Sequence, residues 1–291
     1  MSDLQKRKMA PLEAMEFKRQ QKKIRMITAY DYATASSVNR SEIEIILVGD
    51  SLGMVVLGYD STLPVTMDDM LYHLKPVVNA APDTMVVADM PFLSYHLSVE
   101  QALSNGGSLM RAGADAVKLE GGTARCPAVR ALVDAGIPVM GHLGLTPQAA
   151  AQLGGFKVQG KSATAARTIV EDAVALQEAG VFAIVLEAVP HELARIITER
   201  LTVPTIGIGA GPGCDGQVLV IHDMLGWFDR FRPKFVKQYA NLGQEIDRAL
   251  AAFAREVADG SFPQPEHCFN MKENELKQLL DGLQVPVEGR G

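Results

Sequence analysis

The stretch Val48-Gly49-Asp50-Ser51-Leu52-Gly53 follows directly on an apolar run, Ile45–Val48, that predicts a buried strand. Asp50 and Ser51 come where the strand stops. Three later apolar runs end in the same way, each at one carboxylate: 85–88 at Asp89, 116–119 at Glu120 and 183–186 at Glu187. Because parallel strands in a barrel deliver their carboxyl ends to one face, these four carboxylates are expected to converge on one mouth.

Apolar runs of this kind recur along the whole chain and alternate with helical segments. We expect strands at 24–29, 45–48, 85–88, 116–119, 138–140, 183–186, 204–208 and 218–221. The alternation predicts a closed (β/α)8 barrel of the α/β class, since parallel strands need crossover connections and closure leaves no exposed edge. The alternative is an open doubly wound sheet, which normally carries a glycine-rich phosphate loop after its first strand. Here that position holds Tyr30-Asp31-Tyr32, so the barrel is favoured.

The chain ends are expected to extend a single barrel domain that covers residues 1–291. The N-terminal segment, 1–23, is predicted to be helical, with its basic residues on a solvated face and Met9, Leu12, Met15 and Phe17 partly buried. A long helix is predicted over 235–258, and the tail at 260–291 is predicted to hold another helix near 272–283. Within the barrel, Thr66 and Ser98 are the predicted N-caps of two helices.

The composition argues against several classes of partner. The chain has 47% hydrophobic residues, 21% charged residues and a formal net charge of −6, which is ordinary for a globular enzyme and unsuited to nucleic acid or an anionic membrane. No apolar run approaches the roughly 20 residues of a membrane helix. The three cysteines, Cys126, Cys214 and Cys268, are odd in number and widely spaced, which argues against disulfides and zinc and favours a cytoplasmic location.

The converging carboxylates predict a metal site. One acidic residue after a strand is as often a helix cap as a ligand, but several buried like charges are costly without a cation. Asp50, Asp89 and Glu120 suit a hard divalent ion, Mg²⁺ by default, which takes few protein oxygens and leaves positions open. Ser51 adds a hydroxyl, and Lys118 lies on the same strand face as Glu120. Lys118 taken alone is equally consistent with a structural barrel lysine.

A metal beside a lysine favours a 2-oxo acid as substrate, because a polarised keto group makes the neighbouring C–H acidic. Glu187 is free to act as the base; its structural alternative is a cap for the helix near Pro190. His142 is predicted either to line the mouth or to be a hydrogen-bonded structural histidine. The glycine-rich stretch 207–213 does not match a dinucleotide-binding pattern and predicts a tight loop.

Five ordered motifs resemble the ketopantoate hydroxymethyltransferase family of pantothenate biosynthesis, over about residues 27–269. They are Leu47–Tyr59, Ala88–Phe92, Val117–Gly122, Gly141–Gln148 and Cys214–Val220. The chain differs from the family pattern at Ser41–Glu44 and at Gln20–Lys23, both away from the predicted mouth.

The resemblance implies a (β/α)8 barrel that uses Mg²⁺ to transfer a one-carbon unit from 5,10-methylenetetrahydrofolate to 3-methyl-2-oxobutanoate. Carried over by motif, it implies a metal site of Asp50, Asp89 and Glu120, the last directly or through water. It also implies substrate contacts by Asp50, Ser51, Asp89 and Lys118, with Glu187 as base. The family's assembly implies a homodecamer of stacked pentameric rings.

Two other functions are compatible with the same residues. One is a metal-dependent aldolase or lyase that acts on another 2-oxo acid, which would turn over substrate without a folate. The other is a non-catalytic protein that binds folate or an oxo acid, although the full set of predicted catalytic carboxylates argues against it.

Overall fold

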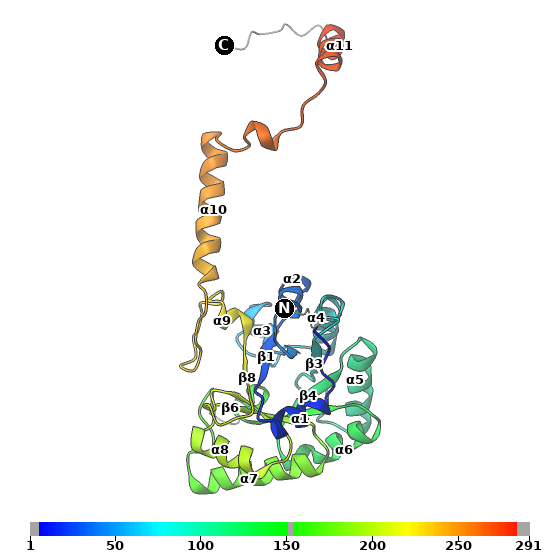
Figure 1. Cartoon of the computed structure of the whole chain (residues 1–291), viewed down its shortest axis with the longest axis vertical. Helices are drawn as coiled ribbons and strands as arrows, with labels where there is room; N and C mark the ends of the chain where they lie inside the picture. Colours follow the sequence, from blue (N-terminus) through cyan, green and yellow to red (C-terminus); the bar gives the residue numbers. More distant parts are fainter. Residues whose placement is uncertain (1–5, 151–153, 284–291) are drawn as a thin grey trace. The chain divides into compact units, whose positions relative to one another are not determined.

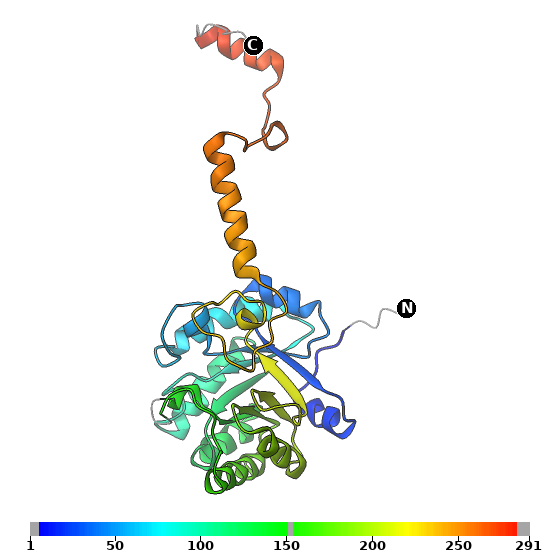
Figure 2. The ribbon, with the colours of Figure 1, turned by 90° about the vertical axis from the view of Figure 1, so that its left-hand side faces the viewer.

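Residues 6–150 and 154–283 are described by the computed structural model, whose core is a closed barrel of eight parallel strands (Figure 1). The strands are β1 (Ile24–Thr28), β2 (Ile45–Val48), β3 (Met85–Asp89), β4 (Ala116–Glu120), β5 (Val139–Gly144), β6 (Ala183–Glu187), β7 (Thr205–Ile208) and β8 (Gly216–Leu219). Each strand pairs with the next, and β8 returns to β1, with Val218 opposite Met26. Figure 2 shows this closure, where the blue β1 lies beside the yellow β8. The predicted (β/α)8 barrel is therefore confirmed.

One helix precedes β1, several connect successive strands, and the last three of those described follow β8. The helices are α1 (Glu13–Arg19), α2 (Tyr32–Asn39), α3 (Leu52–Val55), α4 (Met67–Ala80), α5 (Val99–Arg111), α6 (Cys126–Asp134), α7 (Ala163–Glu178), α8 (His191–Arg200), α9 (Ile221–Met224), α10 (Leu242–Asp259) and α11 (Glu273–Leu283). Both predicted caps are confirmed: the Thr66 side chain accepts from Asp69 N–H in a capping box, and Ser98 accepts from Gln101 N–H.

The strands are buried on both faces, which explains their continuous apolar runs. Outward-facing side chains such as Ile46 and Val86 pack with the helices in one cluster. Inward-facing side chains such as Met85 and Val87 fill the barrel interior and pack with Met9 and Ala14 of the N-terminal segment. The N-terminal segment therefore closes the barrel at the amino ends of its strands, opposite the predicted mouth.

The basic residues of this segment form the predicted solvated face only in part: Arg7 and Arg19 are exposed, whereas three lysines make polar contacts with the barrel. Lys8 Nζ lies 2.9 Å from Asp115 Oδ2, and Lys18 Nζ lies 2.9 Å from Asp215 Oδ2. Lys6 Nζ donates to Thr84 Oγ1 at 2.6 Å. Among the described residues the helix covers only Glu13–Arg19, and Leu12 is 77% exposed where partial burial was expected. The lysines instead fasten the segment to the barrel.

Three predicted boundaries were wrong. Strand β8 ends at Leu219, because Ile221 turns into α9 and packs among the outer helices. Strand β5 continues through His142 to Gly144, paired with β6. The helix expected from residue 235 begins only at Leu242, because Phe235 packs its ring against Gly209 instead.

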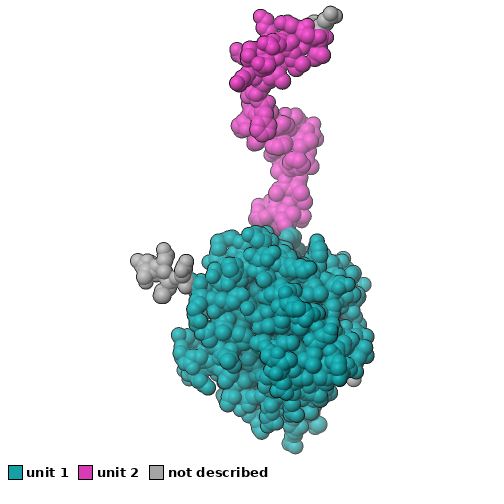
Figure 3. All heavy atoms as spheres, turned by 90° about the vertical axis from the view of Figure 1, so that its right-hand side faces the viewer, with its two compact units in different colours: residues 1–240 teal, residues 241–291 magenta. Residues whose placement is uncertain are grey.

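The chain divides into two compact units, Met1–Ala240 and Asn241–Gly291 (Figure 3). The first contains the whole barrel and its mouth. The second contains α10 and α11 and begins before the tail that we expected at 260–291. In the described part of the chain, none of the helices has both the length and the apolar composition needed to cross a bilayer.

Candidate active site

A cavity of about 530 Å³ opens at the carboxyl ends of the strands. Its lining includes every site residue that the sequence predicted, together with His142: Asp50, Ser51, Asp89, Lys118, Glu120 and Glu187. These side chains come from β4, β5 and β6 and from the ends of β2 and β3. The predicted convergence on one mouth is therefore confirmed, although the role of each residue stays a prediction.

Asp50, Asp89 and Lys118 form the centre of the polar side of the cavity. Lys118 Nζ lies 2.7 Å from Asp89 Oδ1, and both side chains are 4% exposed. The other oxygen of the Asp89 carboxylate accepts from the backbone N–H of Asp50 at 3.0 Å. Burial, with the nearby charges of Asp89 and Glu120, raises the pKa of Asp50 well above its usual range. The site thus concentrates negative charge that Lys118 alone does not neutralise.

Two residues without a predicted role, Tyr95 and Gln148, hold these carboxylates in place. Gln148 Nε2 donates to Asp50 Oδ2 at 2.8 Å, and the Gln148 backbone N–H donates to Glu120 Oε2 at 3.1 Å. The Tyr95 hydroxyl donates to Gln148 Oε1 at 2.7 Å and accepts from the Glu120 N–H at 3.1 Å. Gln148 ends one of the quoted family motifs, which is the signal in the sequence that could have marked it.

The carboxylates fit a divalent cation of the Mg²⁺ type in one specific way. Within residues 6–150 and 154–283, no three His, Cys, Asp or Glu side chains are grouped as a metal cluster. Mg²⁺, however, is usually held by one or two carboxylates, with water and substrate completing its shell. Asp50 and Asp89 supply two neighbouring carboxylates, and the Asp89 carboxylate accepts from the backbone N–H of Asp50. Burial is the first cause that raises the pKa of each, and a bound cation would stabilise both charged forms.

His142 lies between two glutamates on the next part of the wall. Its Nδ1 is 3.4 Å from Glu120 Oε1, and its Nε2 is 3.3 Å from Glu187 Oε2. Burial and the nearby Lys118 lower the pKa of His142, but the contacts with Glu120 and Glu187 outweigh them and raise it to about 9. The raised pKa favours a protonated imidazole beside the Glu187 carboxylate, and Lys118 Nζ, at 3.3 Å from His142 Nδ1, opposes it. His142 lines the mouth, the first of its two predicted alternatives. Its Nδ1 lies near Lys118 as well as Glu120, whereas its Nε2 has no hydrogen-bond partner among the described residues.

The backbone around Glu187 fixes where this carboxylate projects. Glu187 is the last residue of β6, and Ala188 after it has a left-handed φ of 46°, uncommon for a residue with a Cβ. That conformation is held by hydrogen bonds from Ala188 N–H to Ile208 O at 2.8 Å and from Gln159 N–H to Ala188 O at 2.9 Å. Helix α8 begins later, with Pro190 as N-cap and no side-chain cap, so the predicted capping alternative for Glu187 was wrong.

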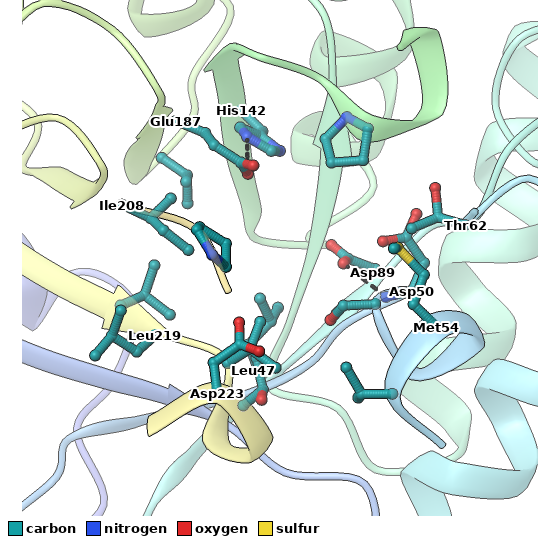
Figure 4. Close-up of a pocket in the computed structure, with 18 of the residues that line it drawn as sticks. Leu47, Asp50, Met54, Thr62, Asp89, His142, Glu187, Ile208, Leu219 and Asp223 are labelled. Carbon is teal, nitrogen blue, oxygen red and sulfur yellow. Dashed lines mark hydrogen bonds and ion pairs between the residues drawn. The ribbon is translucent and has the colours of Figure 1, made fainter. Parts of the chain in front are cut away.

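The lining residues occupy three sides of the cavity, as Figure 4 shows. Asp50 and Asp89 lie on one side, and Glu187 and His142 lie on a second. The third side carries Asp223, beside apolar side chains that include Leu47 and Leu219. In the glycine-rich stretch 207–213, Gly207 and Ile208 end β7, and only residues 209–213 form the tight loop that we predicted, with left-handed φ at Gly209 and Gly211.

The chain matches the family model described as ketopantoate hydroxymethyltransferase over residues 8–265. It is 65% identical over 268 residues to the 3-methyl-2-oxobutanoate hydroxymethyltransferase of Heliobacterium modesticaldum, covering 92% of this chain and 97% of that protein. It is 63% identical over 259 residues to the protein of the same name from Moorella thermoacetica, covering 89% and 96%.

Solved structures with the same fold are more distant in sequence. A phosphonopyruvate hydrolase complex with oxalate and Mg²⁺ superposes with a TM-score of 0.59 at 12% identity, covering 95% of this chain and 97% of that one. A 2,3-dimethylmalate lyase of the PEP mutase/isocitrate lyase superfamily superposes with a TM-score of 0.58 at 17% identity, covering 94% and 97%. At these identities the likeness concerns the barrel fold.

Proposed function

The chain belongs to the ketopantoate hydroxymethyltransferase family, and from that premise we propose how its residues carry out the reaction and which partners they require. As in the relatives that share its sequence, the reaction is transfer of a hydroxymethyl group to 3-methyl-2-oxobutanoate, which gives 2-dehydropantoate for pantothenate synthesis. We propose 5,10-methylenetetrahydrofolate as the donor and Mg²⁺ as the metal. The observation that carries the proposal is the separation of two groups in one cavity: carboxylates with one lysine on β2–β4, and an independent glutamate on β6.

The first group would bind the metal and the oxo acid. Asp50 and Asp89 would hold Mg²⁺, with Glu120 acting through water, because Gln148 and Tyr95 keep Glu120 oriented behind them. When bound, the ion would polarise the keto group and make the C3–H acidic. Ser51 and Lys118, with Asp50 and Asp89, would contact the polar end of the oxo acid, and this fixes C3 toward the opposite wall.

The second group would move the proton. Glu187 takes the C3 proton as a carboxylate, and His142 at 3.3 Å holds that carboxylate and supplies a neighbouring positive charge. The electron pair left on C3 forms a bond to the methylene carbon of the folate. Both carbon–nitrogen bonds of that methylene carbon break, the two folate nitrogens take up one proton from Glu187 and one from water, and the hydroxide left from the water becomes the hydroxyl group. The products are 2-dehydropantoate and tetrahydrofolate, so atoms and charges balance.

The test is to follow two reactions of the purified enzyme in parallel. With Mg²⁺ and 3-methyl-2-oxobutanoate in deuterated water, the C3 hydrogen is expected to exchange without folate; with methylenetetrahydrofolate added, 2-dehydropantoate is expected to form. Turnover of an oxo acid that ignores the folate would favour the lyase alternative. Tight binding of metal and oxo acid with neither reaction would favour the binding-protein alternative.

Lys118 is expected to act as a cation and not as a Schiff-base nucleophile. Burial lowers the pKa of its ammonium, but Asp89, Glu120 and Asp50 outweigh burial and raise it above the usual value, so the amine stays protonated. Treatment with borohydride in the presence of the oxo acid should therefore leave the Lys118 peptide unmodified in a mass spectrum. An adduct at Lys118 that is absent from exposed Lys75 in the same digest would contradict this role.

We also propose that the enzyme is a cytoplasmic homodecamer. The apolar side chains of Leu250, Phe253 and Val257 follow one another at helical spacing on α10, and all are exposed in this chain, which suits contact with further copies of it. Free Cys126 and Cys214 are compatible with a reducing compartment. Analytical ultracentrifugation is expected to give a decamer, and Phe253→Asp is expected to shift it to smaller species. A wild-type monomer would contradict the assembly.

A further inference from the structure

The third side of the cavity has no part in the chemistry assigned so far, yet it is built like a binding site. It lies at the ends of β7 and β8, across from the proposed metal and apart from Glu187 (Figure 4). Its lining carries one carboxylate, Asp223 in α9, among apolar side chains such as Leu219 and Val220. Thr28 lies beside them, and its Oγ1 accepts from the Ile221 N–H. A cavity of about 530 Å³ falls in the range for drug-sized ligands, roughly 300–1,000 Å³, and exceeds what a five-carbon oxo acid fills.

The segment 227–236, which we call the strap, follows α9 and supplies aromatic side chains to the lining of the same cavity. Phe228, Phe231 and Phe235 of the strap line the cavity, and Phe156 joins them from the loop before α7. Phe231 is 61% exposed and Phe156 is 52% exposed. Burial of a large aromatic side chain lowers the free energy more than burial of a smaller one, and aromatic rings stack on one another. This wall therefore favours an aromatic ligand.

The strap is anchored at several points and is therefore a defined wall. Arg230 Nη1 donates to Gly58 O at 3.0 Å, which joins the strap to the loop after α3. The Phe235 ring packs on Gly209, where a Cβ would lie only 2.6 Å from Cδ1 of the ring. The single tryptophan, Trp227, stacks on His222 with ring centroids 5.0 Å apart.

Asp223 is the polar group that this wall offers to a ligand. Its carboxylate forms no hydrogen bond or ion pair with another described residue, and burial raises its pKa to about 6. An acceptor with two free oxygens in a half-buried position matches a ligand that presents two adjacent N–H donors. The strap also carries Arg230, Arg232 and Lys234 against one acid, Asp229, so the rim would attract a ligand with an anionic tail.

We propose that this third side is the binding site of the reduced folate, with Asp223 accepting from the 2-amino and ring N–H groups of the pterin and the phenylalanines of the strap covering the rings. The inference rests on the proposed function, in which a folate is the one-carbon donor. In a reduced folate bound here, the methylene carbon would lie between the strap and the oxo acid. The glutamate tail would extend past the basic side chains at the rim.

The test separates folate binding from oxo-acid chemistry in one variant. Asp223→Asn keeps the shape of the side chain and removes its charge, so the KM for methylenetetrahydrofolate and the Kd for tetrahydrofolate are expected to rise roughly ten- to a hundredfold. Binding of tetrahydrofolate is measured by quenching of Trp227 fluorescence, independently of turnover. The folate-free exchange at C3 is expected to keep at least about half of its rate.

Asp229→Asn is the matched control, because it makes the same change on the strap at an exposed side chain outside the cavity lining. It should leave both measurements unchanged. Phe231→Ala removes an exposed ring, which should not unfold the barrel, and should weaken tetrahydrofolate binding at least about fivefold if stacking contributes as aromatic contacts usually do.

Three outcomes would overturn the assignment. Wild-type affinity for tetrahydrofolate in both Asp223→Asn and Phe231→Ala would place the folate elsewhere. A fall in C3 exchange as large as the rise in folate KM would place Asp223 at the oxo acid. An equal loss of folate affinity in Asp229→Asn would mean that the charge of the strap, and not a contact with Asp223, causes the loss. Failure of the proposed function is distinct from all three, since it would appear in the wild-type enzyme as missing exchange or missing folate-dependent transfer.

Discussion

Asp89→Asn is expected to lower the affinity for Mg²⁺ by at least roughly hundredfold and to reduce C3 exchange and turnover with it. Asp89 supplies one proposed metal ligand and pairs with Lys118 at 2.7 Å, and both interactions need its negative charge. The amide oxygen of asparagine can still accept the Asp50 N–H. Isothermal titration with Mg²⁺, and exchange measured at saturating metal, report the two losses separately. Asp134→Asn, at an exposed position on α6, controls for the chemical change.

Asp50→Asn distinguishes loss of metal binding from loss of stability. In the metal-free protein Asp89→Asn leaves Lys118 buried without its closest partner, and breaking such a pair costs about 3–5 kcal/mol. Asp50→Asn removes a carboxylate whose pKa is raised by burial and by like charges, so its melting temperature should be unchanged or higher. Both variants should lose metal affinity. Wild-type enzyme that still exchanges C3 hydrogen after complete chelation of metal would contradict a metal role for either aspartate.

The position of the site could be predicted from the sequence because strand ends in a barrel are periodic. Asp50, Asp89, Glu120 and Glu187 each follow an apolar run, and parallel pairing alone carries such residues to one face. The same reasoning applies to Asp223, which follows the eighth run, although no motif in the sequence assigned it a role. Only the structure shows that Asp223 lies on a different side of the cavity from Asp50, Asp89 and Glu187 (Figure 4).

The supporting residues could not be predicted, because their partners are distant along the chain. Tyr95 and Gln148 are 53 positions apart in the sequence and bond to each other. The Tyr95 hydroxyl also accepts from the backbone N–H of Glu120 in β4, and Gln148 Nε2 donates to the Asp50 carboxylate after β2. Neither stands at a strand end, so no periodic pattern marks them. The strap was missed for a related reason: Phe235 and Val236 fit a helical pattern, but tertiary packing of Phe235 on Gly209 outweighs that local preference.

Glu187→Gln is expected to lower C3 exchange and turnover together, by roughly 10²- to 10⁴-fold, because a positioned general base contributes about that factor. The amide keeps the shape of the side chain and removes the basic oxygen. Affinity for Mg²⁺ and for the oxo acid should be retained, since Glu187 lies on β6, apart from the carboxylates of β2–β4 (Figure 4). Glu171→Gln, at an exposed position on α7, is the matched control and should behave as wild type.

The melting temperature of Glu187→Gln supplies the independent readout. Glu187 makes no capping bond to α8, and its side chain contacts His142 without a well-aligned hydrogen bond, so stability should change by no more than about 2 °C. A structural role predicts the reverse pattern, a lower melting temperature with near-normal exchange, and that result would remove Glu187 from the mechanism. The expected variant loses exchange at C3 but keeps its stability and its affinity for metal and oxo acid. Because the same variant would then show normal folding, metal binding and substrate binding, proton transfer is the step left for Glu187 to perform.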